Sequence, residues 1–374
     1  MKLLAHKKLF IPCVILLLTG CVAKFLPEIN EEKELLVVQG LITDGTGADT
    51  IKLTRSAPLG QSSAATPVEH SYVSISDDQG STVSFWEMWP GTYVSPAYFH
   101  GVIGRSYVLH ISVNSSAGNV NYESYPMEMK PVPPIDSIYY EKTVIEPAAG
   151  NFKGVDGCQI YLDTHDPENN CRYFRWDFSE TWVLRLPFPV VNQICWISNK
   201  SSDLNIKSTA AFNEARVTRL PINYISNITD RLKTKYSINV NQYSLNEDEY
   251  AYWEKIQNVV VQVGGLYDFI PASIPGNIKC IENPGEKVLG YFSVSAKSSK
   301  RIYIKDNFEG IIDRYNNCVK GTIPYSDTLK AGEWILDDEQ YAIPPYKVIT
   351  DDKGCADCTV RGTNIKPDFW KDGK

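Results

Sequence analysis

Apolar and polar positions alternate along most of the chain after residue 34. Runs such as 71–76 and 104–111 alternate with a period of two, and the turn-forming run 77–80 follows the first of them. A period of two is the pattern of a half-buried strand, whereas a helix repeats about every 3.6 residues. Short strands that recur about every ten residues are typical of a β-sandwich. The pattern therefore predicts an immunoglobulin-like β-sandwich over residues 35–130.

A proline-rich run marks the first predicted domain boundary. Residues 131–134 read Pro-Val-Pro-Pro, and prolines donate no ladder hydrogen bond and hold the chain extended. We therefore expect a linker at residues 131–134, a second domain at residues 135–350 and a C-terminal segment at residues 351–374. Further alternating runs follow the linker, so we expect the second domain to be larger than the first and rich in strands.

The strand predicted over residues 171–185 carries the strongest pattern of the second domain. One of its faces consists of Arg172, Phe174, Trp176, Phe178, Glu180, Trp182 and Leu184. Four large aromatic side chains on one face indicate burial, since each removes a large apolar area from water. Burial among these rings would raise the pKa of Glu180 and suit it to general acid catalysis. A buried glutamate also pairs with an arginine or a backbone donor, and no second carboxylate is placed to complete a catalytic dyad.

A helical period of apolar positions occurs near residues 244–263. Ser244 and Glu247 have the spacing of a capping box, in which the serine oxygen and the glutamate carboxylate satisfy free backbone N–H groups. The apolar residues that share one face are Leu245, Tyr252, Ile256, Val260 and Val263. A glycine pair at 264–265 ends the run. The sequence therefore predicts a mainly β protein with one main helix, which packs on the second sheet.

Residues 1–20 have the composition of a secretory signal. Three lysines accompany an apolar run at residues 9–18, which is too short to span a bilayer core that needs about 20 residues. The sequence Leu-Thr-Gly-Cys that ends at Cys21 resembles a bacterial lipobox, which implies cleavage between Gly20 and Cys21 and acylation of the cysteine sulfur. An ordinary secretion signal with a chance cysteine is the alternative. We expect a tether at 21–34 and a lipid anchor without a membrane span.

Net charge narrows the function classes. The 374-residue chain has a formal net charge of −7, and loss of three lysines with the signal peptide changes this to −10. An acidic chain argues against nucleic-acid binding, which relies on basic surfaces. Such a chain is also not drawn to anionic headgroups. We therefore expect the lipid, rather than charge, to hold the protein at its membrane.

Seven of the nine cysteines lie beyond residue 150. Cys13 leaves with the signal peptide and Cys21 carries the lipid, which leaves Cys158, Cys171, Cys195, Cys280, Cys318, Cys355 and Cys358. In an exported chain we expect disulfides with one thiol left over, and the pairing stays open. Cys158 and Cys171 flank a strand-turn-strand pattern and are the first candidates for a local bridge. The spacing of Cys355 and Cys358 also occurs in redox and zinc sites, but no further ligands complete a metal site, so we expect a structural clasp over residues 351–374.

Candidate chemistry is sparse in the rest of the sequence. The chain has no GxSxG elbow, HExxH motif, P-loop or GxGxxG motif, so we predict no cofactor, no metal and no catalytic residue. A hydrolase centred on Glu180 remains as a third hypothesis. Trp86, Trp89 and Tyr93 suit a contact surface, because aromatic rings supply a large contact area for a sugar or a protein at low entropic cost. The alternative is that these rings close one end of the sandwich.

Several stretches together resemble a known family. They read ELLVVQGLITDG near the start, PVPPIDSIYYE at the predicted boundary, and RYFRWDFSETW, VLGYFSVSA and CADCTVRGTNIKPDFW further on. These stretches resemble Bacteroidetes outer-membrane lipoproteins that share a domain of unknown function and are often encoded beside TonB-dependent receptors. The motifs VSISDDQGS, GTY and GRSYVLHI are likewise similar to the prealbumin-like sandwiches of exported receptors.

The resemblance implies a lipid-anchored outer-membrane protein, on either the periplasmic or the surface side. It also implies a binding or accessory role, without enzymatic activity, beside an outer-membrane β-barrel receptor for nutrient uptake. Among functional positions only Cys21 carries over, and we expect Trp370 to plug an apolar end of the second domain. The second hypothesis is a surface glycan-binding protein or adhesin that uses Trp86 and Trp89. The small-molecule or glycan ligand stays unassigned.

Overall fold

The computed structural model describes most of the chain after residue 33. Its described residues are 34–56, 65–115, 118–145, 155–263, 274–311, 314–315 and 317–372. The predicted signal peptide, Gly20 and Cys21 therefore lie outside the described residues. Strands dominate the described part of the chain, as the sequence predicts. None of the helices in this part is long and apolar enough to cross a membrane.

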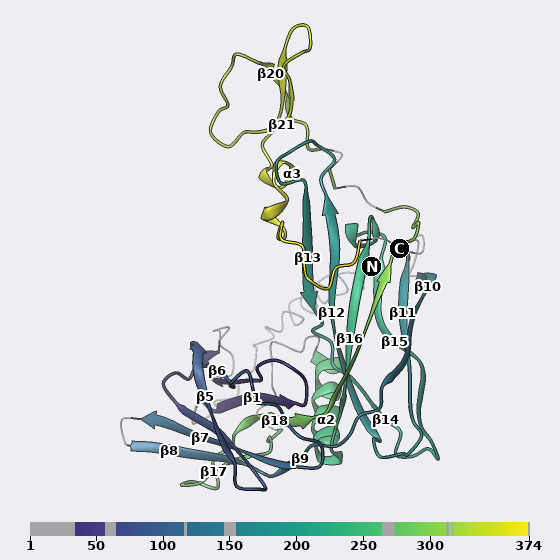
Figure 1. The fold of residues 1–374 in the computed structure, drawn as a ribbon. Helices are drawn as coiled ribbons and strands as arrows, with labels where there is room; N and C mark the ends of the chain where they lie inside the picture. The colour runs from purple at the N-terminus through teal and green to yellow at the C-terminus, as the bar shows by residue number, and fades with distance from the viewer. Residues whose placement is uncertain are drawn as a thin grey trace, which may run out of the picture. The chain divides into compact units, whose positions relative to one another are not determined.

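The first sandwich is built from short strands that follow one another closely (Figure 1). They are β1 (Leu36–Thr43), β2 (Thr50–Arg55), β3 (Thr66–Pro67), β4 (Tyr72–Asp77), β5 (Thr82–Trp89), β6 (Thr92–Val94), β7 (Ser106–Ser115), β8 (Gly118–Ser124) and β9 (Met127–Glu128). With β17 (Ile278–Cys280) and β18 (Leu289–Ser295), the order of the sheet is β17-β8-β7-β4-β5-β6-β2-β1-β18, with β3 beside β2 and β9 beside β7. The first half of β5 pairs with β4 and its end pairs with β6. The sheet thereby folds over an apolar core, and the predicted N-terminal sandwich is confirmed.

Two strands of this sheet come from far along the chain. β18 pairs in parallel with β1, and β17 pairs antiparallel with β8. Gly290 permits the parallel contact, because its φ is +85° and a Cβ atom there would lie 2.0 Å from the carbonyl oxygen of Val38. The first sandwich therefore contains residues from both sides of the proline run at 131–134, which a local proline signal cannot reveal.

Two further sheets pack together as a second sandwich. One contains β10 (Ile135–Ile145), β11 (Val155–Asp166) and β15 (Ala215–Ser226); the other has the order β13-β12-β16-β19, with β14 beside β12. The strands of the latter are β12 (Tyr173–Arg185), β13 (Ile194–Lys200), β14 (Asn205–Ser208), β16 (Tyr236–Ser244) and β19 (Lys297–Ile304). Apolar side chains from both sheets share one core. The face of β12 that the sequence predicts to be buried is buried from Phe174 to Leu184.

The proline run is tied to the second core. Trp176 Nε1 donates to Gln242 Oε1 at 2.8 Å, and Gln242 Nε2 donates to the carbonyl oxygen of Pro133 at 2.9 Å. Gln242 is fully buried, so these bonds satisfy polar groups that water does not reach. Residues 131–134 form no helix or strand, and this contact fixes the path of the chain between the two sandwiches.

The main helix, α2 (Glu247–Val263), is confirmed, but it begins later than the capping-box sequence predicts. The Ser244 hydroxyl donates to the carbonyl oxygen of Lys130 at 2.6 Å and accepts from Ala296 N–H at 3.2 Å, so it joins strands instead of capping the helix. The carbonyl oxygen of Asn246 accepts the first helical bond, from Tyr250 N–H at 2.9 Å. The capping-box prediction is therefore wrong, because Ser244 is the last residue of β16.

The helix contacts both sandwiches. The ring of Tyr252 lies 4.7 Å from that of Tyr291 on β18, whereas the ring of Tyr250 lies 5.2 Å from that of Tyr173 on β12. The predicted contact with the second sheet is therefore present, and the contact with the first sandwich adds to it. The side chains of Val260 and Val263, which the sequence places on the buried face, lie outside the described residues.

The C-terminal region forms a small sheet followed by short helical turns. Its elements are β20 (Gly321–Pro324), β21 (Trp334–Glu339), β22 (Tyr346–Thr350), α3 (Lys353–Ala356) and the 3₁₀ turn η3 (Cys358–Val360), with β22 in the middle of the sheet. Cys355 forms a disulfide with Cys318, and Cys358 forms one with Cys195 of β13. The first cysteine of the CxxC sequence thus ties this region to the segment before β20, and the second ties it to the second sandwich.

The local bridge predicted between Cys158 and Cys171 is wrong. Both thiols are unpaired and buried, as is Cys280, so three thiols remain where the odd count suggests one. β11 and β12 belong to different sheets. Cys158 lies eight residues, or about 26 Å along the strand, before the end of β11. Cys171 follows that end too closely for the chain to return over this distance, and a disulfide needs Cα atoms within about 7 Å. Burial raises the pKa of both thiols to about 12, so they stay protonated at neutral pH.

Trp370 packs into the second sandwich, as the sequence predicts. Its ring is 5% exposed and lies 6.5 Å from the ring of Trp196 and 6.1 Å from that of Tyr303. The Lys235 ammonium lies over the same ring, 5.9 Å from its centroid. The last described residues are therefore anchored by packing in addition to the disulfides.

Candidate functional site

A β-bulge places Trp86 and Trp89 on one face of β5. Trp86 lies opposite Val94 and Trp89 lies opposite Thr92, so the two residues between the tryptophans face a single residue of β6. Val94 and Thr92 are two positions apart and share a face, and directly opposed residues share a face as well. Without the extra residue, the two tryptophans would point to opposite sides. They are 49% and 63% exposed.

Tyr93 does not belong to this surface. Its side chain points to the opposite face of β6 and is 1% exposed. Its hydroxyl donates to the carbonyl oxygen of Val68 at 3.0 Å and accepts from Ser71 N–H at 2.9 Å. The prediction that Tyr93 joins the contact surface is therefore wrong, because its position next to the turn in sequence does not show which face it occupies.

The turn that carries Trp89 is held in place by polar contacts. The carboxylate of Glu87 accepts from the backbone N–H of His70 and from that of Gly91, both at 2.8 Å. Gly91 has a φ of +65°, and a Cβ atom there would lie 2.6 Å from the carbonyl oxygen of Leu53. Only glycine fits this close approach without strain. The exposed ring of Trp89 therefore stands on a turn whose conformation is fixed.

Tyr72 extends this surface, although the sequence pattern did not reveal it. Ser74 of β4 lies opposite Ser84 of β5, so Tyr72 and Trp86, each two positions away, share the same face. The hydroxyl groups of Tyr72 and Ser84 form a hydrogen bond of 2.9 Å, and Tyr72 is 57% exposed. We name Tyr72, Trp86 and Trp89 the aromatic face. Alternation marks Tyr72 as outward, but only the strand register joins it to the tryptophans.

Glu180 lies in a buried network of paired groups. It is 4% exposed. Arg231, from the 3₁₀ turn η2 (Asp230–Leu232), donates to its two oxygens at 2.9 and 3.1 Å. The hydroxyl of Tyr236 donates to Glu180 Oε2 at 2.7 Å. Burial and the neighbouring carboxylate raise the pKa of Tyr236 well above its usual value, so the phenol remains a donor.

This network continues to the C-terminal region. Asp230, next to Arg231, pairs with Arg361 at 2.9 Å, and Arg361 also donates to the hydroxyl of Tyr315 at 2.6 Å. The pairs balance each other's charge inside the protein, where an unpaired carboxylate would be costly. Glu180 therefore follows the second interpretation given by the sequence, pairing with an arginine, and it links β12 to the residues that follow η3.

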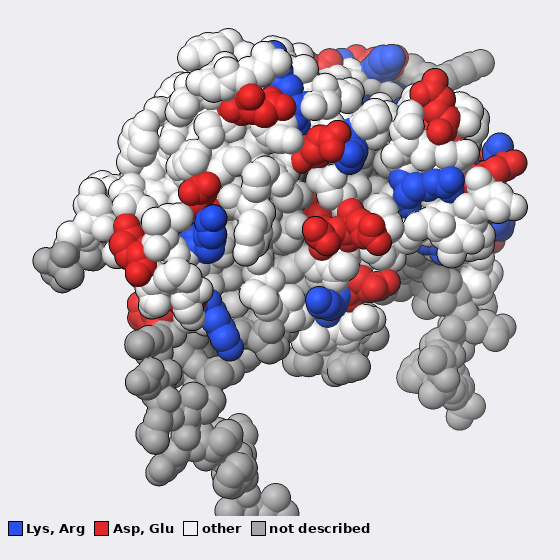
Figure 2. Space-filling model, turned by 90° about the horizontal axis from the view of Figure 1, so that it is seen from below, with Lys and Arg blue, Asp and Glu red and all other residues white. Residues whose placement is uncertain are grey.

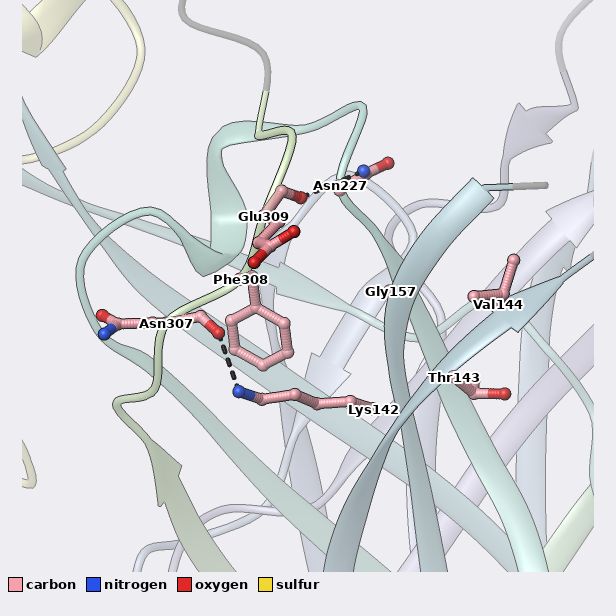
Figure 3. A pocket seen from close by; sticks show the side chains of 8 residues that line it. All are labelled: Lys142, Thr143, Val144, Gly157, Asn227, Asn307, Phe308 and Glu309. Atoms are coloured by element: carbon pink, nitrogen blue, oxygen red, sulfur yellow. Dashed lines mark hydrogen bonds between the residues drawn. The ribbon is translucent and has the colours of Figure 1, made fainter. Parts of the chain in front are cut away.

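Side chains that line the pocket drawn in Figure 3 are engaged with the segment beside it. The pocket measures about 280 Å³ and lies between β10, β11 and residues 307–309. Lys142 Nζ donates to the carbonyl oxygen of Asn307 at 2.7 Å, pairs with Asp306 at 3.0 Å and lies 5.2 Å from the centroid of the Phe308 ring. Its only lysine is thus engaged with the segment beside it, so these groups hold that segment against β10.

Metal ligation finds no support in the predicted cysteine clasp. Cys355 and Cys358 are both bound in disulfides, so neither sulfur is a free thiolate. Among the described residues, no group of three His, Cys, Asp or Glu side chains is placed to hold a metal ion. The aromatic face is therefore the candidate functional site that the described geometry leaves accessible.

Comparison with known proteins identifies a family. A family model described as "Domain of unknown function (DUF4249)" matches residues 22–301. This range includes the first sandwich and ends within β19, so it omits β20 to β22 and three of the four disulfide-bonded cysteines. A search of curated proteins finds no match.

Proposed function

We propose a binding function, without catalysis, for this chain, which belongs to the DUF4249 family of unknown function. In this proposal Cys21 carries a lipid that anchors the protein to the outer membrane. The folded part then acts as an accessory component beside a TonB-dependent β-barrel receptor for nutrient uptake. The lipobox resemblance supports the anchor. The resemblance to lipoproteins that are often encoded beside TonB-dependent receptors supports the partner.

The observation that carries a binding function is the contrast between the aromatic face and the Glu180 network. Trp86 on β5 and Trp89 beside the fixed turn are exposed, so their backbone is ordered before a ligand or partner binds. Glu180, the most promising catalytic candidate in the sequence, has both oxygens bonded to Arg231. An external molecule can therefore contact the exposed tryptophans, whereas Glu180 is occupied by its arginine partner.

The distribution of charge supports a lipid anchor over electrostatic attachment. On the described part of the face shown in Figure 2, basic side chains stand among acidic and uncharged ones. Anionic headgroups attract clusters of Lys and Arg. A chain whose net charge is −10 after loss of the signal peptide gains little from such headgroups, which supports the proposal that acyl chains supply the anchor.

Acylation is tested by a cysteine variant. Cells that express the tagged full chain are fed an alkyne-bearing palmitate, and the protein is examined for label and for its membrane fraction. We expect label and membrane retention in the wild type, and loss of both in Cys21→Ser. Cys13→Ser serves as the matched control, because its thiol lies in the discarded signal. Equal labelling of the wild type and Cys21→Ser would refute the anchor.

The partner is tested by gentle extraction. The tagged wild type is solubilised from its native membrane in a mild detergent and captured, and co-purifying proteins are identified by mass spectrometry. We expect a β-barrel receptor in amounts comparable to the bait. Recovery of the bait alone, under conditions that preserve another known receptor complex, would contradict the accessory role.

A further inference from the structure

We infer that the first sandwich binds a neutral oligosaccharide across the aromatic face and a groove beside it that carries both polar and apolar groups. This inference rests on the proposed binding function and deepens it by naming the ligand class. The groove measures about 310 Å³, at the lower end of the range of small-ligand sites, about 300–1,000 Å³. Side chains along it include Tyr72, His110, Ser112, Asn121, Glu123 and Ile281. Tyr72 belongs to both surfaces and joins them.

The strand register explains why these side chains gather on one face. Tyr72 of β4 lies opposite Ser112 of β7, which lies opposite Asn121 of β8. In the neighbouring row, His110 of β7 lies opposite Glu123 of β8. Directly opposed residues share a face, and the two rows are two positions apart on β7. The groove is therefore part of the same sheet surface as the aromatic face.

The polar groups of the groove match the hydroxyl groups of a sugar. Glu282 accepts from Asn121 N–H at 2.9 Å and from its Nδ2 at 2.7 Å, which orients the amide and leaves Oδ1 as an acceptor. His110 Nε2 shares a 2.8 Å hydrogen bond with the Ser76 hydroxyl. Among the described residues, no hydrogen bond or ion pair engages the Glu123 carboxylate, which leaves an acceptor for sugar hydroxyls. Acceptors and hydroxyl groups thus lie beside stacking rings.

Charge selects a neutral sugar. Glu123 and Glu282 lie at the groove, and the nearest lysine in the register, Lys279 opposite Glu123, lies over the ring of Tyr125 at 5.8 Å. The whole chain also carries a net negative charge. An anionic polysaccharide would be repelled, whereas a neutral one loses nothing by approaching. With one lysine against two carboxylates the groove keeps a net negative charge, which argues against uronic-acid polymers and for uncharged pyranoses.

The spacing of the two tryptophan rings favours an oligosaccharide over a monosaccharide. The bulge sets three positions of β5 against two of β6, so Trp86 and Trp89 are about 7 Å apart along the strand. One pyranose ring stacks on one tryptophan, whereas several linked rings reach both tryptophans and the groove beside Tyr72. A protein partner is less well matched, because protein interfaces have an apolar centre with a polar rim. Here the polar groups of Ser112, Asn121 and Glu123 lie in the groove itself, beside the apolar side chain of Ile281.

The experiment measures binding of the purified chain to polysaccharides of known charge. Affinity electrophoresis through gels that contain a glucan, a mannan or a xylan is compared with gels that contain polygalacturonate. Calorimetric titration with the matching monosaccharide, disaccharide and hexasaccharide follows for any polymer that retards the protein. We expect retardation by at least one neutral polymer, none by polygalacturonate, and affinity that rises at least about tenfold from the monosaccharide to the hexasaccharide.

Variants test the residues. Trp86→Ala, Trp89→Ala and Tyr72→Ala should each weaken binding about tenfold, and Glu123→Ala should weaken it by a similar factor. Tyr98→Ala is the matched control, since Tyr98 is 78% exposed on the same sandwich but does not line the groove. Circular dichroism spectra confirm that each variant folds. Retained binding in Trp86→Ala/Trp89→Ala would overturn the assigned site.

The outcomes separate this inference from the proposed function. If none of the neutral polymers retards the wild type, the oligosaccharide inference fails, while the receptor pull-down still decides the accessory role. If the Trp86→Ala/Trp89→Ala variant loses the co-purified receptor but no sugar binds, the aromatic face is a protein contact and the inference is wrong. Loss of sugar binding with an intact receptor complex supports the inference.

Discussion

The two sandwiches use aromatic strands in opposite ways. β12 of the second sandwich directs Phe174, Trp176 and Trp182 into the core, whereas β5 of the first carries Trp86 and Trp89 on an exposed surface. A second sheet, β10-β11-β15, shares the core with β12. Aromatic side chains on a strand thus become core or contact surface according to the layer that packs over them. The comparison predicts large stability effects in β12 and small ones in β5.

The largest effect is expected for Trp176→Ala. The ring is 1% exposed, stacks 5.5 Å from the ring of Phe174 and donates to Gln242. Its removal leaves a cavity and an unpaired buried acceptor, so we expect a loss of about 4–5 kcal/mol in the free energy of unfolding. Urea unfolding followed by circular dichroism measures this. A loss under about 1 kcal/mol, the scale of a surface substitution, would contradict the assignment of this aromatic strand face to the core.

Glu180→Ala should follow, at about 3 kcal/mol. Truncation leaves the Tyr236 hydroxyl and the Arg231 guanidinium without their acceptor, and breaking a buried pair costs about 3–5 kcal/mol. We expect the lower end, because the side chain of Arg231 is 24% exposed and gains water. Urea unfolding again gives the value, with Glu214→Ala, whose ion pair is exposed, as the control. A stable, fully folded variant would revive the catalytic interpretation of Glu180.

A pH-dependent effect is expected within the core of the first sandwich. Burial raises the pKa of Asp49 from 3.8 to about 6, although Thr43 donates to its carboxylate. The folded state therefore holds the proton more tightly than the unfolded state, and this group makes stability fall as pH rises from about 4 to about 6. The shift corresponds to up to about 3 kcal/mol.

The measurement is the difference between two unfolding curves. Wild type and Asp49→Asn are unfolded in urea at pH 4, 5, 6 and 7, and the pH-dependent fall should be present in the former and absent in the latter. The exposed turn residue Asp78 supplies the control variant, Asp78→Asn. Parallel pH profiles of wild type and Asp49→Asn would contradict the raised pKa.

The smallest stability effect is expected for Trp86→Ala and Trp89→Ala. Exposed side chains away from caps and networks change stability by about 0.5 kcal/mol or less. Thermal unfolding should therefore give nearly the wild-type midpoint for each variant. A clear loss of stability would mean that the rings close one end of the sandwich, as the alternative interpretation of these residues holds. That result would argue against a binding role for them.

The sequence could predict those features that depend on local pattern. The alternation from Phe174 to Leu184 required a buried strand face, and the apolar period around Tyr252 required a helix. Both patterns have one physical solution each, since a strand repeats every two residues and a helix about every 3.6. The mainly β class with one main helix followed directly from these elements.

Features that depend on register or on distant partners were not readable. The bulge at the end of β5 decides that Trp89 joins Trp86 while Tyr93 turns inward, and nothing in the residue types marks an inserted position. Ser244 has the residue type of a helix cap, but the carbonyl oxygen of Lys130 competes for its hydroxyl. The disulfide partner of Cys358 lies 163 residues earlier, and sequence spacing does not encode such a contact.

The parallel pairing of β1 with β18 also sets an order of events in folding. Synthesis delivers Val37 long before its partner Leu289, so β1 exists for a time with one unpaired edge. An open strand edge is a template for pairing with other chains. Contacts of such high sequence separation also form slowly, because a long loop must close first. A nascent chain that stops before residue 289 is therefore the form of this protein most exposed to aggregation.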